Sequence, residues 1–285
     1  MATSMKLSLK ATPTLDITST RVAGDGEIAQ PVGMTVMAVD GTDIIIVIDL
    51  TNMCVKSFYK KHGASRHSRL SLESNPLDLT KLQNNQVAVT LPILKQILIV
   101  NVKPELETLR AIETSKSYVG ITFLPPSSLA ASSQEPPCVD ILDMNGTVKR
   151  TIGLGPFCNT FIMDSPNVLC TTKTGNILVS DGDSKRLVCL KPNGEKLFTY
   201  IDPDRTEKVL STPDFDAQLR TTSISTGDIL VTDFSLNRVF HLTESGEFVG
   251  DILTDLMYPI GICEDGDGRV YVLSGGIKVF TLVWK

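Results

Sequence analysis

A repeated segment constrains the fold of this chain more than any other feature. The stretch NILVSDGDSKRL, compared from Ile177 to Leu187, aligns without a gap with DILVTDFSLNRV (Ile229 to Val239) and with DIIIVIDLTNMCV (Ile45 to Val55). In each copy an apolar run ends in Asp, and a second apolar run begins after a polar loop. A chain that repeats such a unit is expected to repeat one unit of structure.

Weaker copies extend the pattern to six units. They are QVAVTLPILKQI from Val87 to Ile97, SLAASSQEPPCV from Leu129 to Val139, and RVYVLSGGI from Val270 to Ile277. The units begin at residues 45, 87, 129, 177, 229 and 270, so their starts are 42, 42, 48, 52 and 41 residues apart. A period in the forties indicates a repeat architecture.

Each unit consists of short runs of Val, Ile, Leu and Thr broken by polar turns, without sustained helical periodicity, so it is expected to form strands. A motif upstream of several units predicts an innermost first strand: PVGM at Pro31, YVGI at Tyr118, PIGI at Pro259 and the variant NPLDL from Asn75. A downstream tetrad predicts a hairpin turn whose glycine adopts positive φ. These glycines are Gly63, Gly146, Gly194 and Gly246.

Six four-stranded units around an axis predict one all-β domain over residues 1–285, a six-bladed β-propeller, which leaves only short, protected sheet edges. The last unit reaches Trp284 and Lys285 after its third strand. Its fourth strand is expected from the other end of the chain, where KLSLKATPTLDI, Lys6 to Ile17, alternates apolar and polar residues. The N-terminal strand is therefore predicted to close the ring on the last blade.

The sequence of the units resembles the NHL repeat, with P-x-G-[IM], then [ND]-I-L-V-[ST]-D, then N-R-V or K-R-L and a turn ending in glycine. The resemblance spans nearly the whole chain and is weakest in units two, three and six, where Leu91, Ser133 and Ser274 replace the repeated Asp. Such domains form the partner-binding part of tripartite-motif (TRIM) ubiquitin ligases and their relatives, where they hold protein or RNA. The resemblance therefore implies a platform that recruits a protein substrate for a TRIM-like ligase, with an RNA-binding platform as the alternative.

Composition disfavours several classes of partner. The net charge of −5 provides no overall attraction to RNA or to anionic lipid. The start MATSMKLSLK has no apolar signal core, and no apolar run approaches the roughly 20 residues of a membrane span, which predicts a soluble, cytoplasmic protein. The six cysteines are scattered without C-x-x-C pairs, so neither a disulfide framework nor a zinc site is indicated.

The repeated acids Asp49, Asp181 and Asp233 are the most conspicuous polar residues, and the last two are followed five residues later by Arg186 and Arg238. An Asp at the start of a loop can accept backbone N–H groups, and an Arg at its end can hold the carboxylate in a forked contact. We interpret these residues as a structural framework that recurs with the blade. A role in binding is the alternative.

The sequence indicates no catalytic group and no metal site. The acidic stretches DGDSK at Asp181 and EDGDG at Glu264 lack the spacing of the twelve-residue calcium loop and are interpreted as hairpin turns. Asp78 is the only acid in the first-strand motifs, whereas the calcium-dependent hydrolases found on six-bladed propellers need several acidic and amide ligands in the channel. The prediction is a domain that is not an enzyme and uses no cofactor or metal, with a metal-dependent propeller hydrolase as the second alternative.

Two other stretches differ in composition from the rest. KKHGASRHSR, from Lys60 to Arg69, is the only concentrated positive segment, and it is interpreted as a solvated outer strand guarded by charge against edge pairing rather than as a phosphate contact. LPPSSLAASSQEPPC, Leu124 to Cys138, contains prolines that cannot serve a central ladder, which predicts a long irregular loop.

The loops between the second and third strands vary most among the copies, and in a propeller they emerge on one face. This variation predicts that a protein partner docks there, because loops can change without disturbing the core. The predicted binding residues lie in these loops outside the Asp and Arg framework. They are Lys95, Gln96, Lys185, Phe234 and Asn237.

Overall fold

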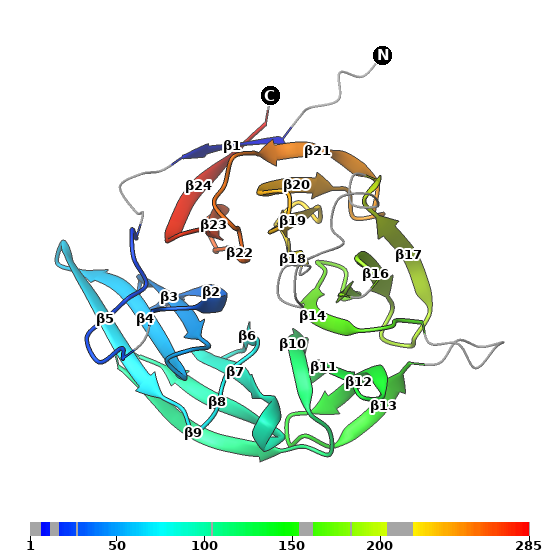
Figure 1. The fold of residues 1–285 in the computed structure, drawn as a ribbon, viewed down its shortest axis with the longest axis horizontal. Helices are drawn as coiled ribbons and strands as arrows, with labels where there is room; N and C mark the ends of the chain where they lie inside the picture. The colour runs from blue at the N-terminus through cyan, green and yellow to red at the C-terminus, as the bar shows by residue number, and fades with distance from the viewer. Residues whose placement is uncertain are drawn as a thin grey trace.

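The computed structural model describes residues 7–11, 17–26, 28–103, 105–153, 162–182, 184–203 and 219–284. Its strands form six four-stranded antiparallel sheets around a central axis (Figure 1). The predicted all-β, six-bladed propeller is confirmed. Within the described part of the chain, no helix is long and apolar enough to cross a membrane.

Each blade is a meander whose first strand lies nearest the axis. Blade 1 consists of β2 (Pro31–Val39), β3 (Thr42–Asp49), β4 (Cys54–Lys61) and β5 (Ala64–Ser71). Blade 2 consists of β6 (Leu79–Lys81), β7 (Gln86–Leu91), the 3-10 turn η2 (Pro92–Leu94), β8 (Gln96–Val102) and β9 (Leu106–Glu113). Blade 3 consists of β10 (Tyr118–Leu124), β11 (Ser128–Gln134), β12 (Pro137–Asp143) and β13 (Val148–Ile152).

The second half of the ring follows the same order. Blade 4 consists of β14 (Pro166–Thr171), β15 (Ile177–Asp181), β16 (Arg186–Leu190) and β17 (Lys196–Ile201). Blade 5 consists of β18 (Leu219–Ser223), β19 (Ile229–Asp233), β20 (Arg238–Leu242) and β21 (Phe248–Leu253). Blade 6 consists of β22 (Gly261–Glu264), β23 (Arg269–Leu273), β24 (Ile277–Trp284) and, from the other end of the chain, β1 (Leu7–Ala11).

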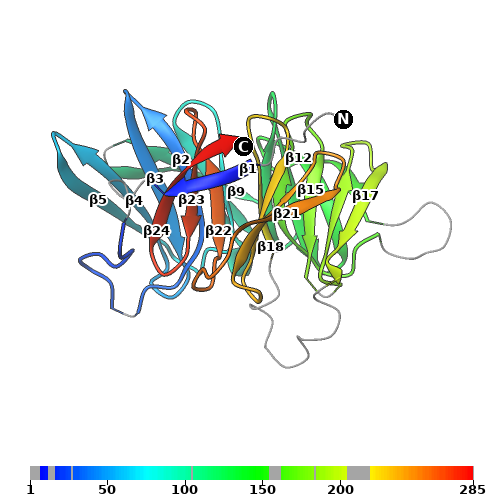
Figure 2. The same cartoon turned by 90° about the horizontal axis from the view of Figure 1, so that it is seen from above.

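The meander order gives the ring two different faces, which Figure 2 shows edge-on. The loop face carries the second-to-third strand loops and the connections between blades, and the turn face carries the other hairpin turns. Where described, the loop face comprises 50–53, 92–95, 135–136, 182–185, 234–237 and 274–276 together with 18–30, 72–78, 114–117, 162–165, 202–203 and 254–260. Where described, the turn face comprises 40–41, 82–85, 125–127, 172–176, 224–228 and 265–268 together with 62–63, 103, 105, 144–147, 191–195 and 243–247.

The N-terminal strand closes the ring, as predicted. β1 pairs antiparallel with β24, in a register that runs from Leu7 opposite Trp284 to Ala11 opposite Phe280. Leu7 is 1% exposed and belongs to the core between blades 5 and 6. Of the predicted range Lys6 to Ile17, the described strand covers Leu7–Ala11. Ile17 forms a separate bridge with Ile277, and residues 6 and 12–16 lie outside the described residues.

The apolar core is divided into six clusters, each lying between two neighbouring blades. A central strand therefore buries both of its faces, and all five residues of β15 and of β19 are buried. Double-sided burial explains why the repeated runs ILVSD and ILVTD are almost continuously apolar instead of alternating.

Hydroxyl groups join the innermost strands of neighbouring blades. Thr80 Oγ1 accepts the N–H of Phe123 at 3.2 Å, and Thr122 Oγ1 accepts the N–H of Thr171 at 3.0 Å. The backbones also approach closely here: a Cβ on Gly120 would lie 1.8 Å from the carbonyl oxygen of Asn167. A side chain at this position would therefore clash with the neighbouring blade.

Two turn predictions have different outcomes. The tetrad glycines all have positive φ, between 78° and 93°, as predicted. The long irregular loop predicted for 124–138 is wrong, because its middle forms β11, which pairs with β10 and β12. The four prolines lie outside that strand, two in the turn at 125–127, one in the loop at 135–136 and one at the start of β12, so none removes a donor of β11 itself. Its small side chains are buried from Leu129 to Ser133.

Deleting residues 1–11 should lower the free energy of unfolding by more than about 3 kcal/mol, because it removes the buried Leu7 and exposes the paired edge of β24. Urea unfolding would measure the change. The exposed substitution Lys10→Ala in the same strand is the control and should leave the midpoint unchanged. An unaltered midpoint in the truncated chain would show that the ring does not depend on β1.

Candidate functional site

The repeated Asp and Arg lie at the mouths of the second-to-third strand loops. Asp181 and Arg186 occupy directly opposite positions on β15 and β16, because five residues of spacing leave a four-residue loop between them. The Asp181 carboxylate accepts the N–H of Ser165 at 2.7 Å and the Nε–H of Arg186 at 3.0 Å. Asp181 thus joins its own loop to the preceding interblade connection.

In the other two copies of the repeat, the Asp contacts its cation in a different way. Asp233 and Arg238 are also opposite each other, but Arg238 Nε lies 3.9 Å from the Asp233 carboxylate, and the guanidinium also contacts Asp202 and Asp251. The first copy has no Arg at this spacing, and Lys56 takes its place, with Nζ 2.6 Å from the Asp49 carboxylate. The repeat therefore keeps the Asp at the same position in all three copies, whereas the basic residue that contacts it differs in type and distance.

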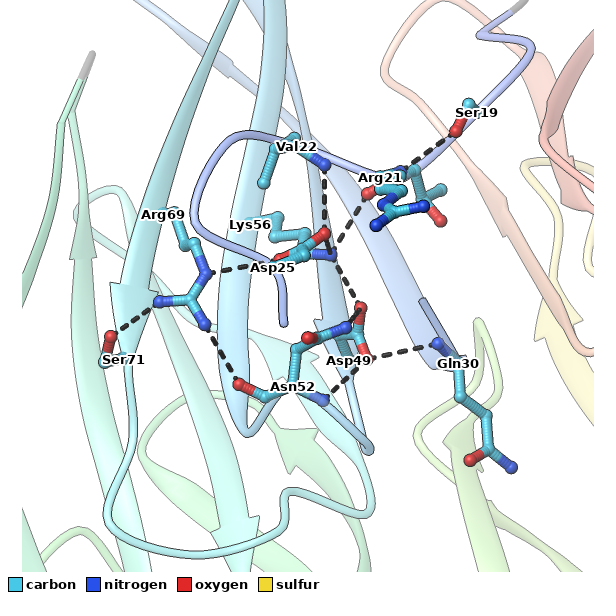
Figure 3. A network of polar contacts seen from close by, with 11 residues as sticks. Ser19, Arg21, Val22, Asp25, Gln30, Asp49, Asn52, Lys56, Arg69 and Ser71 are labelled. Carbon is cyan, nitrogen blue, oxygen red and sulfur yellow. Dashed lines mark hydrogen bonds and ion pairs between the residues drawn. The ribbon is translucent and has the colours of Figure 1, made fainter. Parts of the chain in front are cut away.

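Lys56 is the centre of a buried polar network in blade 1 (Figure 3). Its fully buried Nζ donates to Asp25 at 2.7 Å, to Asp49 at 2.6 Å and to the carbonyl oxygen of Thr20 at 3.1 Å. Arg69 approaches Asp25 from β5 at 3.3 Å. The network attaches the segment 17–26, hereafter the strap, to blade 1.

The ionisation of this network follows from its donors. Burial raises the pKa values of Asp25 and Asp49, but the hydrogen bonds from Lys56 and from backbone N–H groups outweigh burial, so both pKa values lie below the ordinary value of 3.8. Both carboxylates are therefore charged at neutral pH.

Two acidic clusters have a geometry that could hold a metal ion, and both are neutralised by a cation of the protein. Lys56 contacts two members of the cluster Asp25, Asp49 and Cys54. Arg269 contacts every member of the cluster Asp43, Asp265 and Asp267, at 2.5, 2.6 and 3.0 Å. Neither cluster presents an open set of oxygen ligands.

A buried ion pair crosses the axis of the ring. Arg220 of blade 5 donates from Nη1 to Asp78, next to blade 2, at 2.6 Å, and Asp78 also accepts the N–H of Ile121 in blade 3 at 2.9 Å. Burial raises the pKa of Asp78, while Arg220 acts in the opposite direction. The only acid among the first-strand motifs thus connects three blades, a contact between residues 142 positions apart that sequence inspection did not find.

The five predicted binding residues do not form one site. Lys95 and Gln96 belong to blade 2, across the ring from blade 5, and Gln96 Nε2 already donates to Glu113 at 2.7 Å. Lys185 belongs to blade 4. Phe234 and Asn237 of blade 5, however, both contact the connection 254–260 that leads to blade 6.

Phe234, Met257 and Tyr258 form what we call the aromatic platform of the loop face. The rings of Phe234 and Tyr258 are stacked with centroids 4.9 Å apart. Asn237 Oδ1 accepts the N–H of Tyr258 at 3.0 Å, and Ser274 Oγ donates to the carbonyl oxygen of Met257 at 2.9 Å. Blades 5 and 6 therefore hold the platform from both sides.

The platform remains open to solvent. Met257 is 65% exposed and Tyr258 is 57% exposed. Beside them lies a hollow of about 320 Å³ lined by Asn237, Asp255, Leu256, Met257 and Tyr258. Sequence inspection missed Met257 and Tyr258, because the comparison of repeats was directed at the second-to-third strand loops and not at the interblade connections.

Large exposed apolar side chains are distributed unequally between the two faces. On the described loop face they are Ile28, Met53, Ile93, Met257 and Tyr258. On the outer strands they are Leu109, Val148, Leu197, Ile201, Phe248 and Val249. The described turn face carries none.

Comparisons with known proteins identify the fold. A catalytically inactive virginiamycin B lyase from Staphylococcus aureus, solved with quinupristin, is 12% identical with a TM-score of 0.63, over 98% of this chain and 100% of the lyase chain. A candidate gluconolactonase is 18% identical with a TM-score of 0.60, over 98% and 99% of the two chains. The WD40 β-propeller domain of Doa1 is 11% identical with a TM-score of 0.59, over 93% and 96%. This chain is a β-propeller.

These similarities correct one prediction and leave another without support. The prediction that the chain is not an enzyme is contradicted, because solved structures with this architecture include virginiamycin B lyases and a candidate gluconolactonase. The number of acids on the first strands was therefore an insufficient ground for it. No family model and no curated protein matches the sequence, so the NHL and TRIM-like assignment is not confirmed.

The substitution Asp181→Ala should lower the free energy of unfolding by about 1–3 kcal/mol, since it removes the acceptor for two backbone N–H groups and leaves Arg186 without its closest carboxylate. Asp267→Ala, at a carboxylate 79% exposed on the turn face, is the control. Denaturant midpoints measure both changes. Unchanged stability in Asp181→Ala would argue against the structural role.

The substitution Lys56→Met should destabilise the fold by about 3–5 kcal/mol at pH 7, because it removes the cation from the buried Asp49 carboxylate and leaves the Asp25 carboxylate with Arg69 alone. The depressed pKa values of Asp25 and Asp49 contribute stability that is present above their unfolded pKa and is lost as the pH falls through their folded pKa. The difference between wild type and variant should therefore shrink below pH 4. Urea unfolding from pH 7 to pH 3 measures it, with the exposed Lys61→Met as control.

Proposed function

We propose that this propeller binds a partner protein on its loop face, and that the aromatic platform receives an apolar side chain of that partner. The observation that carries the proposal is the state of Tyr258. This residue has φ of +50°, stacks on Phe234 and keeps 57% of its surface exposed.

The positive φ of Tyr258 lowers the stability of the fold. A bulky residue at positive φ is a conformational outlier, and a connection that had only to turn would favour glycine or asparagine there. Asp255, three residues earlier, also has positive φ, at 59°. Hydrogen bonds with Asn237 and Ser274 nevertheless fix this strained segment, so the fold tolerates a local loss of stability while it presents an aromatic ring to solvent.

A fixed, exposed tyrosine suits protein recognition. Tyr offers a large contact area with only two side-chain torsions to order, and buried aromatic anchors dominate the binding energy of protein interfaces. The hollow of about 320 Å³ beside the ring offers a place for an apolar side chain of the partner. The other exposed apolar side chains of the described loop face, Ile28, Met53 and Ile93, lie at blades 1 and 2.

A protein fits this site better than RNA does. Asp255 is the one charged residue among the five described residues that line the hollow, and its carboxylate repels phosphate. The resemblance of the units to the NHL repeat, whose domains hold protein or RNA, is compatible with a protein partner. Recruitment of a protein substrate to a TRIM-like ubiquitin ligase is the specific form of the proposal.

A photo-reactive benzoylphenylalanine at position 258 should cross-link one protein in the cells that express this chain, whereas the same group at position 109, on the outer strand β9, should not. With that partner purified, Tyr258→Ala should weaken binding by about thirtyfold or more in calorimetry, the effect expected of an interface hot spot. Leu109→Ala, whose side chain is 45% exposed, should change affinity by less than about twofold.

Equal cross-linking at positions 258 and 109, or an unchanged affinity of Tyr258→Ala, would place the partner elsewhere and contradict the proposal. Cross-links that disappear after ribonuclease treatment, with binding that weakens steeply in salt, would identify RNA instead.

A further inference from the structure

A separate groove lies where the ring closes between blade 6 and blade 1. It has a volume of about 540 Å³. Its walls are the strap, the hairpin of β4 and β5, the start of β3, and Tyr271 of β23. Four segments that are distant in the sequence therefore meet around one cavity, and none of them belongs to the aromatic platform.

The groove carries an excess of positive charge. Arg21 of the strap lines it together with Lys60 and Arg66 of the β4–β5 hairpin. Asp43 is the one carboxylate among its described lining residues, and Arg269 lies 2.5 Å from it. A chain with a net charge of −5 thus concentrates cations at a concave site. A cavity with apolar walls strengthens the attraction of such a site for anions.

Apolar side chains form another part of the lining, beside the polar Thr18, Ser19, Thr42, Ser65 and His67. Ile45 and Phe58 line it and belong to the core between blades 6 and 1, against which Ile17 and Val22 of the strap pack. An apolar surface with cations among its lining residues matches neither a bare inorganic ion nor a neutral hydrocarbon. It is complementary to a molecule that has both an apolar body and an anionic group.

We propose that this groove binds a small organic anion. The apolar, ring-sized body contacts Ile45 and Phe58, and the carboxylate or phosphate is held by Arg21, Lys60 and Arg66. The volume is within the range of about 300–1,000 Å³ that is usual for small-molecule sites. The segment KKHGASRHSR, interpreted from the sequence as a solvated outer strand, thereby contributes cationic residues to a binding site.

The position of the groove predicts a further effect of the ligand. The strap is fixed to blade 1 by Asp25 and Lys56, and a ligand that touches both the strap and the β4–β5 hairpin adds a second attachment between them. Such a ligand binds only the closed ring. It should therefore raise the free energy of unfolding, and the increase should grow as the ligand concentration rises above the dissociation constant.

Phenyl phosphate is a suitable probe because it combines a ring with a phosphate. Isothermal titration calorimetry should detect binding, and hydrogen exchange should show protection confined to the strap and to the β4–β5 hairpin. Inorganic phosphate and benzyl alcohol, each with half of the required chemistry, should bind at least about tenfold more weakly. Benzoate distinguishes a carboxylate preference from a phosphate preference.

The combined variant Arg21→Ala and Lys60→Ala should weaken phenyl phosphate binding by at least about tenfold, the loss expected when charged hydrogen-bond donors are removed. Lys61→Ala, on the same hairpin but outside the groove lining, is the matched control and should bind as the wild type does. Melting curves without ligand establish that both variants are folded, because all three side chains belong to exposed residues.

Three results would overturn the proposal: no heat of binding at millimolar phenyl phosphate, protection located away from the strap and hairpin, or equal binding by the combined variant and the wild type. These outcomes are independent of the proposal for the aromatic platform, whose tests use other residues and a different partner.

Discussion

The pairing of β1 with β24 is the interaction on which the rest of this propeller depends. Each of the six apolar clusters lies between two blades, so every blade needs both neighbours to bury its two faces. Without β1, blade 6 loses its outer strand and Leu7 leaves the core between blades 5 and 6. The cross-axis pair of Asp78 and Arg220 and the network of Lys56 then reinforce a ring that is already closed.

The buried charges of this protein connect its blades and loops to one another. Lys56, Arg220 and Arg269 each neutralise carboxylates that would otherwise resemble catalytic or metal-binding acids. The aromatic platform and the groove at the ring closure differ from these neutralised, buried carboxylates because they lie open at the surface. They expose an aromatic ring in one case and concentrated cations in the other, which are features that folding alone does not require.

Prediction from the sequence succeeded where a local pattern determines the structure. It failed where the structure depends on burial by neighbouring strands or on contacts between residues distant in the sequence. The tetrad glycines adopt positive φ because a tight turn demands it locally. The prolines of 124–138 predict a loop, yet they flank β11, and neighbouring strands bury the Ala and Ser residues between them. Phe234 and Asn237 were selected from the loop variation, whereas Tyr258, their structural partner, lies in a connection that the repeat comparison does not cover.

The sequence by itself determined the number of blades, the order of strands within each blade and the strand that closes the ring, because these follow from a repeated pattern of apolar runs and turns. The tertiary structure decided which charges meet and which side chains remain exposed. Arg220 reaches Asp78 and Lys56 reaches Asp25 only because the closed ring brings distant segments together. Such contacts have no periodic signature, since each occurs once, and a single pairing leaves no pattern along the chain from which it could be predicted.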